Sequence, residues 1–181
     1  MATHDVKLGI GDVSGMFYHA PAGTTLPATA DAALAAAWKE VGDVSQDGIS
    51  LSKDMSVENL RNWANQIKRN YLSEHTETVQ APLISTTEES LKTVLGEDNV
   101  TVNGNTIKVS LSSGSLPPEE AFLFRMKDED DMIVLACKKG QVTALDSVSF
   151  APNGAITWTP TITALDDGWE LIMTEDNGAS S

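Results

Sequence analysis

Residues 71–111, YLSEHTETVQAPLISTTEESLKTVLGEDNVTVNGNTIKVSL, carry the clearest structural signals in the chain. Polar and apolar residues alternate from Tyr71 to Ile84, which predicts a strand with one buried face. Further on, Asn103-Gly104 separates two runs rich in β-forming residues, 100–102 and 106–111. Asn-Gly is a strong hairpin signal because both central turn residues can adopt positive φ. The stretch therefore predicts a strand and a hairpin.

A short helix is expected between these two β elements, over about residues 86–95. Ser85 and Thr86 are each followed by a glutamate three residues later, which is the capping-box pattern of a helix start. Gly96 is expected to end the helix in a left-handed conformation. One short helix is thus predicted within a β-rich chain.

The composition limits the classes of function. The 181 residues are enough for one domain, and 41 % of them are apolar. The net charge of −14, from 26 acidic and 12 basic residues, argues against a nucleic-acid clamp, which needs a basic footprint. Cys137 is the only cysteine, so no intrachain disulfide is possible. The sequence shows no signal peptide and no apolar run long enough to span a bilayer, which predicts a soluble protein made in a cytoplasm.

The N-terminal region, residues 1–42, reads as an arm with a short helix. Glycines and prolines interrupt residues 1–27, whereas the alanine-rich segment 29–39 favours a helix that stops at Gly42. Such an arm is either a mobile terminus or a segment that becomes ordered on a neighbouring subunit. The sequence leaves both open.

The next region gives conflicting patterns. Residues 43–54 are polar and contain Asp47-Gly48, which predicts a turn or loop. Apolar residues from Val57 to Tyr71 recur at helical spacing, which by periodicity alone predicts an amphipathic helix.

Short strands separated by turn signals follow in the C-terminal half. The pattern predicts strands over residues 121–126, 132–137 and 141–145, a second hairpin turn at 152–154, and a further strand from Ile156 to Ala164. Lys139-Gly140 is expected to turn the chain, and Pro160 indicates an edge strand or a bulge. After a turn at Asp166-Asp167-Gly168, residues 169–173 form the last predicted strand. This organisation predicts a single mainly-β domain, a sandwich or barrel over residues 43–175, with a flexible tail at 176–181.

No catalytic constellation stands out, and no cofactor-binding pattern is present. The three histidines have no partner at metal-ligand spacing. The acidic run Asp128, Glu129, Asp130 and Asp131 is the best metal candidate, but it lacks the glycine and distal glutamate of a calcium loop, which favours a solvated hairpin tip. Trp158 and Trp169 could form a carbohydrate platform, although core or interface packing is the simpler interpretation.

Taken in order, three stretches resemble the major tail tube protein of long, flexible-tailed bacteriophages, in particular those of actinobacterial hosts. The first is 20–27, APAGTTLP, with the alanine-rich segment after it and 41–49, VGDVSQDGI. The second runs from 60–63, LRNW, through the threonine-rich strand to the helix that closes on Leu95-Gly96. The third is the C-terminal strand order through 140–143, GQVT, and 156–158, ITW. The resemblance covers about residues 15–170 and favours strands from Ile67 on, leaving 57–66 open between helix and strand.

The resemblance implies a structural role. Such proteins form hexameric rings of β-sandwiches that stack into a tube around a tape-measure protein, between a tail terminator and distal tail or baseplate proteins, and double-stranded DNA later passes through without specific binding. It implies assembly in the host cytoplasm, a place in the virion tail, no membrane and no enzymatic activity. Candidate contacts between subunits or rings are Thr24, Leu26, Pro27, Trp38, Asp47, Ile49, Trp63 and Arg69. Candidate acidic lumen or loop residues are Asp128, Glu129, Asp130 and Asp131.

Two other functions are considered. One is a different tail ring component, a tail terminator or baseplate hub, which would occur as one ring per particle. The other is a carbohydrate-binding β-sandwich using Trp158 or Trp169.

Overall fold

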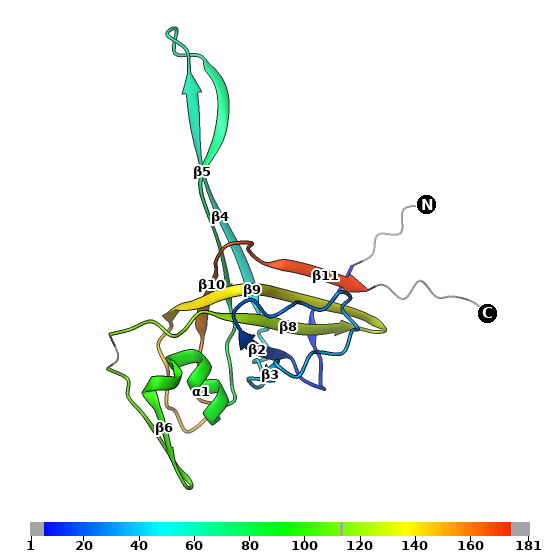
Figure 1. Ribbon diagram of the computed structural model, residues 1–181, viewed down its shortest axis with the longest axis vertical. Helices are drawn as coiled ribbons and strands as arrows, with labels where there is room; N and C mark the ends of the chain where they lie inside the picture. Colours follow the sequence, from blue (N-terminus) through cyan, green and yellow to red (C-terminus); the bar gives the residue numbers. More distant parts are fainter. Residues whose placement is uncertain (1–5, 113, 175–181) are drawn as a thin grey trace, which may run out of the picture.

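The computed structural model describes residues 6–112 and 114–174 (Figure 1). The predicted mainly-β fold with one short helix is confirmed. The helix α1 spans Glu88–Leu95, and a 3-10 turn follows at Glu97–Asn99. The strands are β1 Ile10–Gly11, β2 Phe17–Pro21, β3 Lys39–Glu40, β4 Ser50–Arg61, β5 Ile67–Gln80, β6 Val100–Asn103, β7 Thr106–Val109, β8 Glu120–Asp128, β9 Asp131–Leu145, β10 Pro160–Ala164 and β11 Glu170–Thr174.

One nine-stranded antiparallel sheet forms the body: seven strands follow the order β3-β2-β8-β9-β10-β5-β4, and in addition β1 pairs with β8 and β11 pairs with β9. Strand β9 is its pivot: one edge pairs with β8, and the other pairs first with β11 and then, from Gly140 on, with β10. In Figure 1, β8 and β9 run across the view, whereas β5 and β4 rise along its long axis. The sheet bends in this way around its core, so that a single sheet supplies sandwich-like layers.

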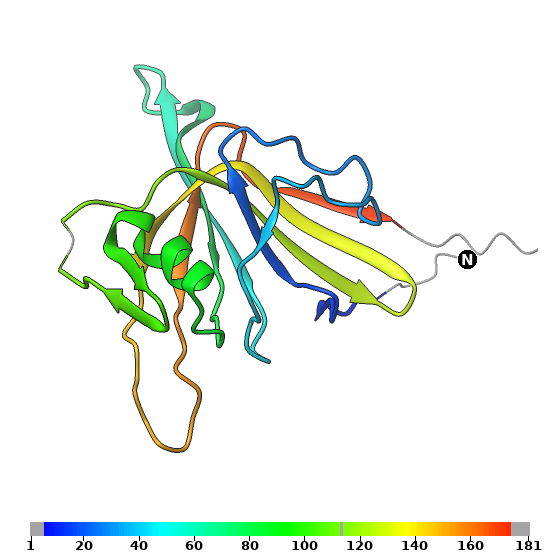
Figure 2. The same ribbon diagram turned by 60° about the horizontal axis from the view of Figure 1, so that its bottom comes forward.

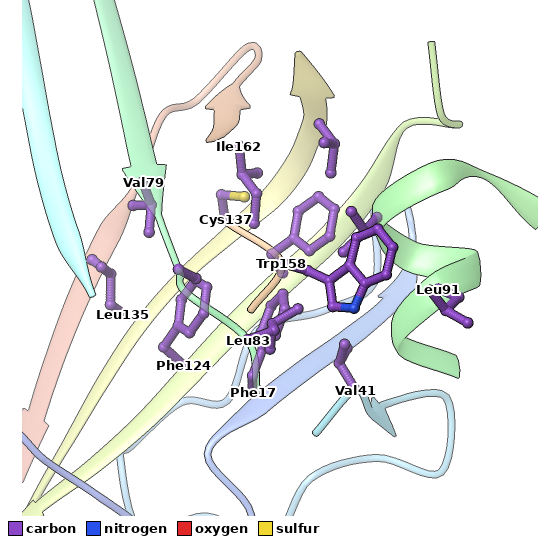
Figure 3. Packing of buried hydrophobic residues seen from close by; sticks show 14 of the residues in the cluster. Phe17, Val41, Val79, Leu83, Leu91, Phe124, Leu135, Cys137, Trp158 and Ile162 are labelled. Carbon is purple, nitrogen blue, oxygen red and sulfur yellow. The ribbon is translucent and has the colours of Figure 1, made fainter. Parts of the chain in front are cut away.

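The main core lies inside the bend (Figure 3). The rings of Phe17 and Phe124 stack with centroids 4.4 Å apart, and Phe122 lies beside Phe17. A second cluster, which includes Leu123 and Trp38, lies on the opposite face of β8. Strand β8 is therefore buried on both faces, which explains the unbroken apolar run AFLF at its start.

Helix α1 covers one end of the core with Leu91 and Val94. Its N-cap is Thr87, whose hydroxyl accepts from the Ser90 backbone N–H at 3.2 Å, while the Ser90 hydroxyl accepts from the Thr87 N–H at 2.8 Å. The predicted caps Ser85 and Thr86 are thus wrong by one or two residues, because the Ser85 hydroxyl accepts from the Asp43 N–H and the Thr86 hydroxyl accepts from the Trp158 indole. Gly96 ends the helix with φ 91° and ψ 141°, positive in φ as expected but not left-handed helical.

The β6–β7 hairpin is confirmed, with its turn one residue later than expected. Asn103 pairs with Thr106, so the central turn residues are Gly104 and Asn105, and only Gly104 has positive φ. Glycine at the first central position is what a type II′ hairpin turn requires.

The expected helix over residues 29–39 is wrong. These residues form turns and an extended path to β3, and Ala30 and Trp38 pack into the second core cluster. The Arg125 guanidinium donates to the Ala32 carbonyl oxygen at 2.8 Å, and the Ala30 N–H donates to the Thr174 hydroxyl. These tertiary hydrogen bonds outweigh the weak preference of a short alanine-rich segment for helix.

The region read as an arm is also part of the sheet. Strand β2 lies between β3 and β8, and Phe17 and Val41 are fully buried in the main core. Over residues 17–41 the structure therefore differs from the arm expected from glycine and proline content, because burial depends on the distant strand β8. Residues 1–5 of the arm, including His4, and the tail at 176–181 lie outside the described residues.

The segment 50–61 is a strand, so the loop expected at 43–54 ends at Ile49. The helical spacing of apolar residues from Val57 does not correspond to a helix. Strand β5 pairs with β4 along its whole length and supplies the backbone hydrogen bonds that a helix would otherwise have made locally. The chain turns back within residues 62–66, where Asn65 adopts φ 62°. Asparagine tolerates this left-handed conformation better than most residues.

Two further turn predictions and the prediction of an edge strand need correction. Strand β9 continues through Lys139-Gly140, where a turn was expected. A Cβ at position 140 would lie 3.0–3.2 Å from atoms of three core side chains, so Gly140 serves close packing. A turn does lie at 152–154, but its flanks form no hairpin. Strand β10 is central and not an edge, although an expected bulge is present near Pro160, between Thr161 and Ile162.

Candidate assembly surfaces

The hairpin of β4 and β5 projects far from the body (Figure 1). Its turn is well ordered: the Asn62 N–H donates to the Gln66 carbonyl oxygen at 3.0 Å, and the Arg61 guanidinium donates to the Asn65 carbonyl oxygen at 2.9 Å. Trp63 stands in this turn with a relative exposure of 105 %. A large aromatic side chain is therefore presented to solvent from a hydrogen-bonded turn.

The strand register divides the hairpin into two faces, because opposite residues point to the same side and neighbours alternate. One side, here called the apolar face, holds five apolar side chains that are each 51–60 % exposed: Leu51, Met55, Val57, Ile67 and Leu72. Polar side chains lie between them on the same side, among them the Lys53–Glu77 ion pair. It continues at its base into Val79, which is fully buried in the core. The apolar face is therefore an extension of the core surface that its own chain leaves uncovered.

The opposite side, here called the polar face, is mainly hydrophilic. It carries Asp54, Glu58 and Glu74, with Arg69 as its one base within the paired strands. Tyr71 donates a hydrogen bond of 2.6 Å to Glu58 on this face, and Leu60 is its exposed apolar residue. The two sides of the hairpin thus differ in apolar content: five exposed aliphatic or thioether side chains lie on the apolar face, whereas Leu60 is the exposed aliphatic residue of the polar face.

Strand β4 also ends the sheet. It pairs with β5 only, and no strand in the described part of the chain pairs with its other edge. A long open edge with free backbone N–H and C=O groups is a template for pairing with another chain. The opposite end of the sheet is β3, a strand of only two residues.

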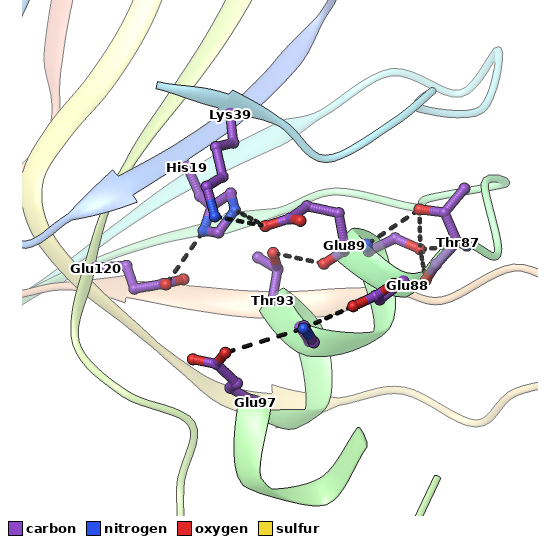
Figure 4. Close-up of polar contacts among 10 residues, drawn as sticks. His19, Lys39, Thr87, Glu88, Glu89, Thr93, Glu97 and Glu120 are labelled. Carbon is purple, nitrogen blue, oxygen red and sulfur yellow. Dashed lines mark hydrogen bonds and ion pairs between the residues drawn. The ribbon is translucent and has the colours of Figure 1, made fainter. Parts of the chain in front are cut away.

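A charged cluster around the buried His19 ties α1 to the sheet (Figure 4). Strand β2 places His19 between Glu89 of α1 and Glu120 of β8, with His19 Nε2 2.7 Å from Glu89 Oε1. His19 Nδ1 lies 3.1 Å from Glu120 Oε1, at an ion-pair distance but without a hydrogen bond. Lys39 Nζ lies 3.8 Å from Glu89. Burial, the largest influence, lowers the pKa of His19, but the contacts with Glu120 and Glu89 together outweigh it and leave that pKa raised.

The cluster predicts a pH-dependent stability. Because folding raises the pKa of His19, its contribution is complete below the unfolded pKa of about 6.5 and is lost as pH rises through the folded pKa. We expect His19→Gln to lower the free energy of unfolding by about 1–3 kcal/mol at low pH and by less at high pH. Urea unfolding of both proteins between about pH 5.5 and 9 measures the difference. His75→Gln, an exposed histidine on the hairpin, is the control, and a pH-independent difference for His19→Gln would contradict the prediction.

The acidic run lies at the β8–β9 turn, as expected for a hairpin tip. Asp128 accepts a 2.9 Å hydrogen bond from the Leu8 N–H, and Asp131 pairs with Lys7. Glu129 occupies the turn itself with φ 53°. Two of the four acids thus hold the N-terminal strand region, and a place in a lumen stays a prediction for all four.

The eight expected contact residues lie in three places. Leu26 and Trp38, at 9 % and 8 % exposure, pack inside their own chain, and Thr24 and Pro27 lie near them in the 22–38 segment. Asp47 and Ile49 precede β4, and Trp63 and Arg69 belong to the hairpin. Contact with a second copy stays a prediction for all of them. The apolar face was missed, although Leu51, Met55 and Val57 alternate with polar residues in 50–58, a period-two signal.

Other candidate chemistry is limited. Trp158 is buried and donates to Thr86, and Trp169 packs against the core beside Phe124, so they do not form an exposed carbohydrate platform. Among residues 6–112 and 114–174, no group of histidine, cysteine or acidic side chains is arranged to hold a metal ion. Burial raises the pKa of the Cys137 thiol to about 12, which leaves it unreactive at neutral pH. No helix in the described chain is long and apolar enough to cross a bilayer.

These observations describe a mainly-β protein whose projecting hairpin and open strand edge are suited to association with another chain. The family described as phage tail tube protein matches residues 8–175. The chain therefore belongs to the phage tail tube protein family and is a structural component of a phage tail.

The comparisons with solved structures and with curated proteins give no further information on function. A chain in the solved structure titled "Virion of native gene transfer agent (GTA) particle" is 10 % identical, with 78 % of this chain and 92 % of that chain covered and a TM-score of 0.44. The comparison with curated proteins found no matching sequence.

Proposed function

We propose that this chain is the repeating subunit of the tail tube, assembling into hexameric rings that stack into the conduit for genome delivery. The observation that carries the proposal is the β4–β5 hairpin, with its open edge and its uncovered apolar face. A two-stranded ribbon is marginal on its own, and exposed apolar side chains gathered on one face mark interaction sites. A second copy of the chain supplies both missing parts, a strand for the edge and a surface for the apolar face.

The charge supports a conduit for DNA. Each copy carries −14, and the polar face of the hairpin holds three carboxylates against one arginine. A wall of this sign repels phosphate, so double-stranded DNA slides past it without specific binding. In this proposal the polar face borders the lumen, where a tape-measure protein lies before DNA passes. The tail terminator and the distal tail or baseplate proteins cap the two ends, and assembly takes place in the host cytoplasm.

The role proposed is structural and not enzymatic. A different tail ring component, a terminator or baseplate hub, is the second candidate, because a ring subunit also needs an open sheet edge. The two differ in repetition: a tube subunit stacks many rings, whereas a terminator or hub forms one.

Electron microscopy of the purified chain, with light scattering over a range of concentrations, tests the proposal. We expect six-fold rings that stack into tubes as the concentration rises. Isolated rings that never stack would select the second candidate. A chain that stays monomeric at high concentration, and also after addition of a tail-tip extract as initiator, would contradict both.

A further inference from the structure

We propose that Trp63, at the tip of the β4–β5 hairpin, inserts into an apolar pocket beside the base of the same hairpin on a second copy of the chain. This inference rests on the proposed function and adds the residues that join one ring to the next. Trp63 is fully exposed, the pocket is lined by apolar side chains, and the two lie at opposite ends of β4.

Trp63 is built as a projecting side chain. Its turn is closed by hydrogen bonds from the Asn62 N–H to Gln66 and from the Asn65 N–H to Asn62, at 3.0 and 2.9 Å. The Asn62 side chain adds two more hydrogen bonds to Gln66, each 2.9–3.0 Å. A loop held this firmly loses little conformational entropy when its exposed indole becomes buried.

The pocket has room for an indole. Its cavity volume is about 360 Å³, and an apolar cavity of about 150 Å³ accommodates a benzene ring. Its apolar lining includes Met16, Val44, Ile49, Phe124 and Met126. Methionine side chains adapt to irregular shapes and make favourable sulfur–aromatic contacts.

The pocket also has polar side chains that can accept a hydrogen bond from an indole N–H. Ser45 and Gln46 line it, and Gln46 is exposed. Either side-chain oxygen could accept from the indole N–H, which needs a partner when tryptophan is buried. An apolar pocket with one or two such acceptors fits tryptophan better than an aliphatic side chain.

Geometry selects a second copy as the source of the tryptophan. Ile49, which lines the pocket, directly precedes β4, and Trp63 lies two residues beyond the end of β4. The 12 residues of β4 therefore separate the pocket from Trp63. At about 3.3 Å per residue the strand spans roughly 40 Å. Figure 2 shows the hairpin tip projecting away from the body, where the segment that precedes β4 lies. Trp63 therefore cannot reach the pocket of its own chain.

Because Trp63 and the pocket lie at opposite ends of β4, a contact between Trp63 of one copy and the pocket of the next is a head-to-tail contact. Such heterologous contacts between identical chains leave an unfilled pocket at one end of the stack and an exposed Trp63 at the other, so assembly continues without closing. This is the type of interface that stacking along the hairpin direction requires.

The first test compares wild type with Trp63→Ala and Leu60→Ala by electron microscopy and sedimentation. Both residues are exposed near the hairpin tip, but only Trp63 belongs to the proposed contact. We expect Trp63→Ala to keep its rings and to raise the concentration needed for stacking at least about tenfold, as for an interface hot spot. Leu60→Ala should stack like wild type, and tubes of Trp63→Ala at the wild-type concentration would overturn the proposal.

The second test is covalent capture of the contact. Ala64→Cys, next to the retained Trp63, combined with Gln46→Cys should form a ladder of disulfide-linked multimers under oxidising conditions, since Cys137 is buried and cannot compete. Ala64→Cys with Asn103→Cys, at the exposed tip of the β6–β7 hairpin, is the matched control. Equal linking of both pairs in a wild-type-like assembly would overturn the Trp63 contact alone, whereas a wild-type chain that never assembles would overturn the proposed function as well.

Discussion

Replacing Phe124 with alanine is expected to lower the free energy of unfolding by about 3–5 kcal/mol. The side chain is almost fully buried, stacks on Phe17 and lies 6.0 Å from Trp169, centroid to centroid. Alanine would leave a cavity between the two parts of the bent sheet, because strands on both sides are fixed by their pairing. Native domains are stable by only about 5–15 kcal/mol, so the loss would consume a large share.

Urea unfolding followed by circular dichroism measures this effect. Phe150→Ala is the control, because Phe150 is mostly exposed and contacts only the edge of Trp158 among the aromatic pairs described. Its cost should stay below about 1.5 kcal/mol. Equal costs for the two variants would mean that the Phe17–Phe124 stack is not the centre of the core.

The second large effect is expected on assembly and not on folding. Val57 and Leu72 face each other on the apolar face, each more than half exposed. Changing both to serine would remove apolar surface that a second copy buries, about 1–2 kcal/mol for each side chain. The association constant should fall roughly a hundredfold, and the concentration at which rings or tubes appear should rise accordingly.

Light scattering against concentration measures the shift, and urea unfolding checks that the monomer keeps its stability. The control is Ser56→Ala with Glu74→Ala, an opposed pair on the polar face of the same hairpin. Its assembly should change little. If both double variants assembled like wild type, the apolar face would not be an interface between copies.

The sequence determined the features that depend on neighbouring residues. The mainly-β class follows from alternation and frequent turn signals, and α1 and the β6–β7 hairpin follow from local capping and turn chemistry within 85–109. Even there, local patterns were off by one or two residues: Thr87 caps the helix because tertiary hydrogen bonds engage the hydroxyls of Ser85 and Thr86.

Tertiary structure alone decided the features that depend on distant partners. Residues 57–61 became strand because β5 pairs with them, and the alanine-rich segment stayed extended because Arg125 and the second core cluster hold it. His19 acquired its raised pKa from Glu89 and Glu120, which lie 70 and 101 positions away in sequence order. The apolar face of the hairpin has the same origin. Its residues are present in the sequence, but only the register between β4 and β5 brings Val57 and Leu72 together on one side. Strand pairing and burial are long-range interactions that no local pattern specifies.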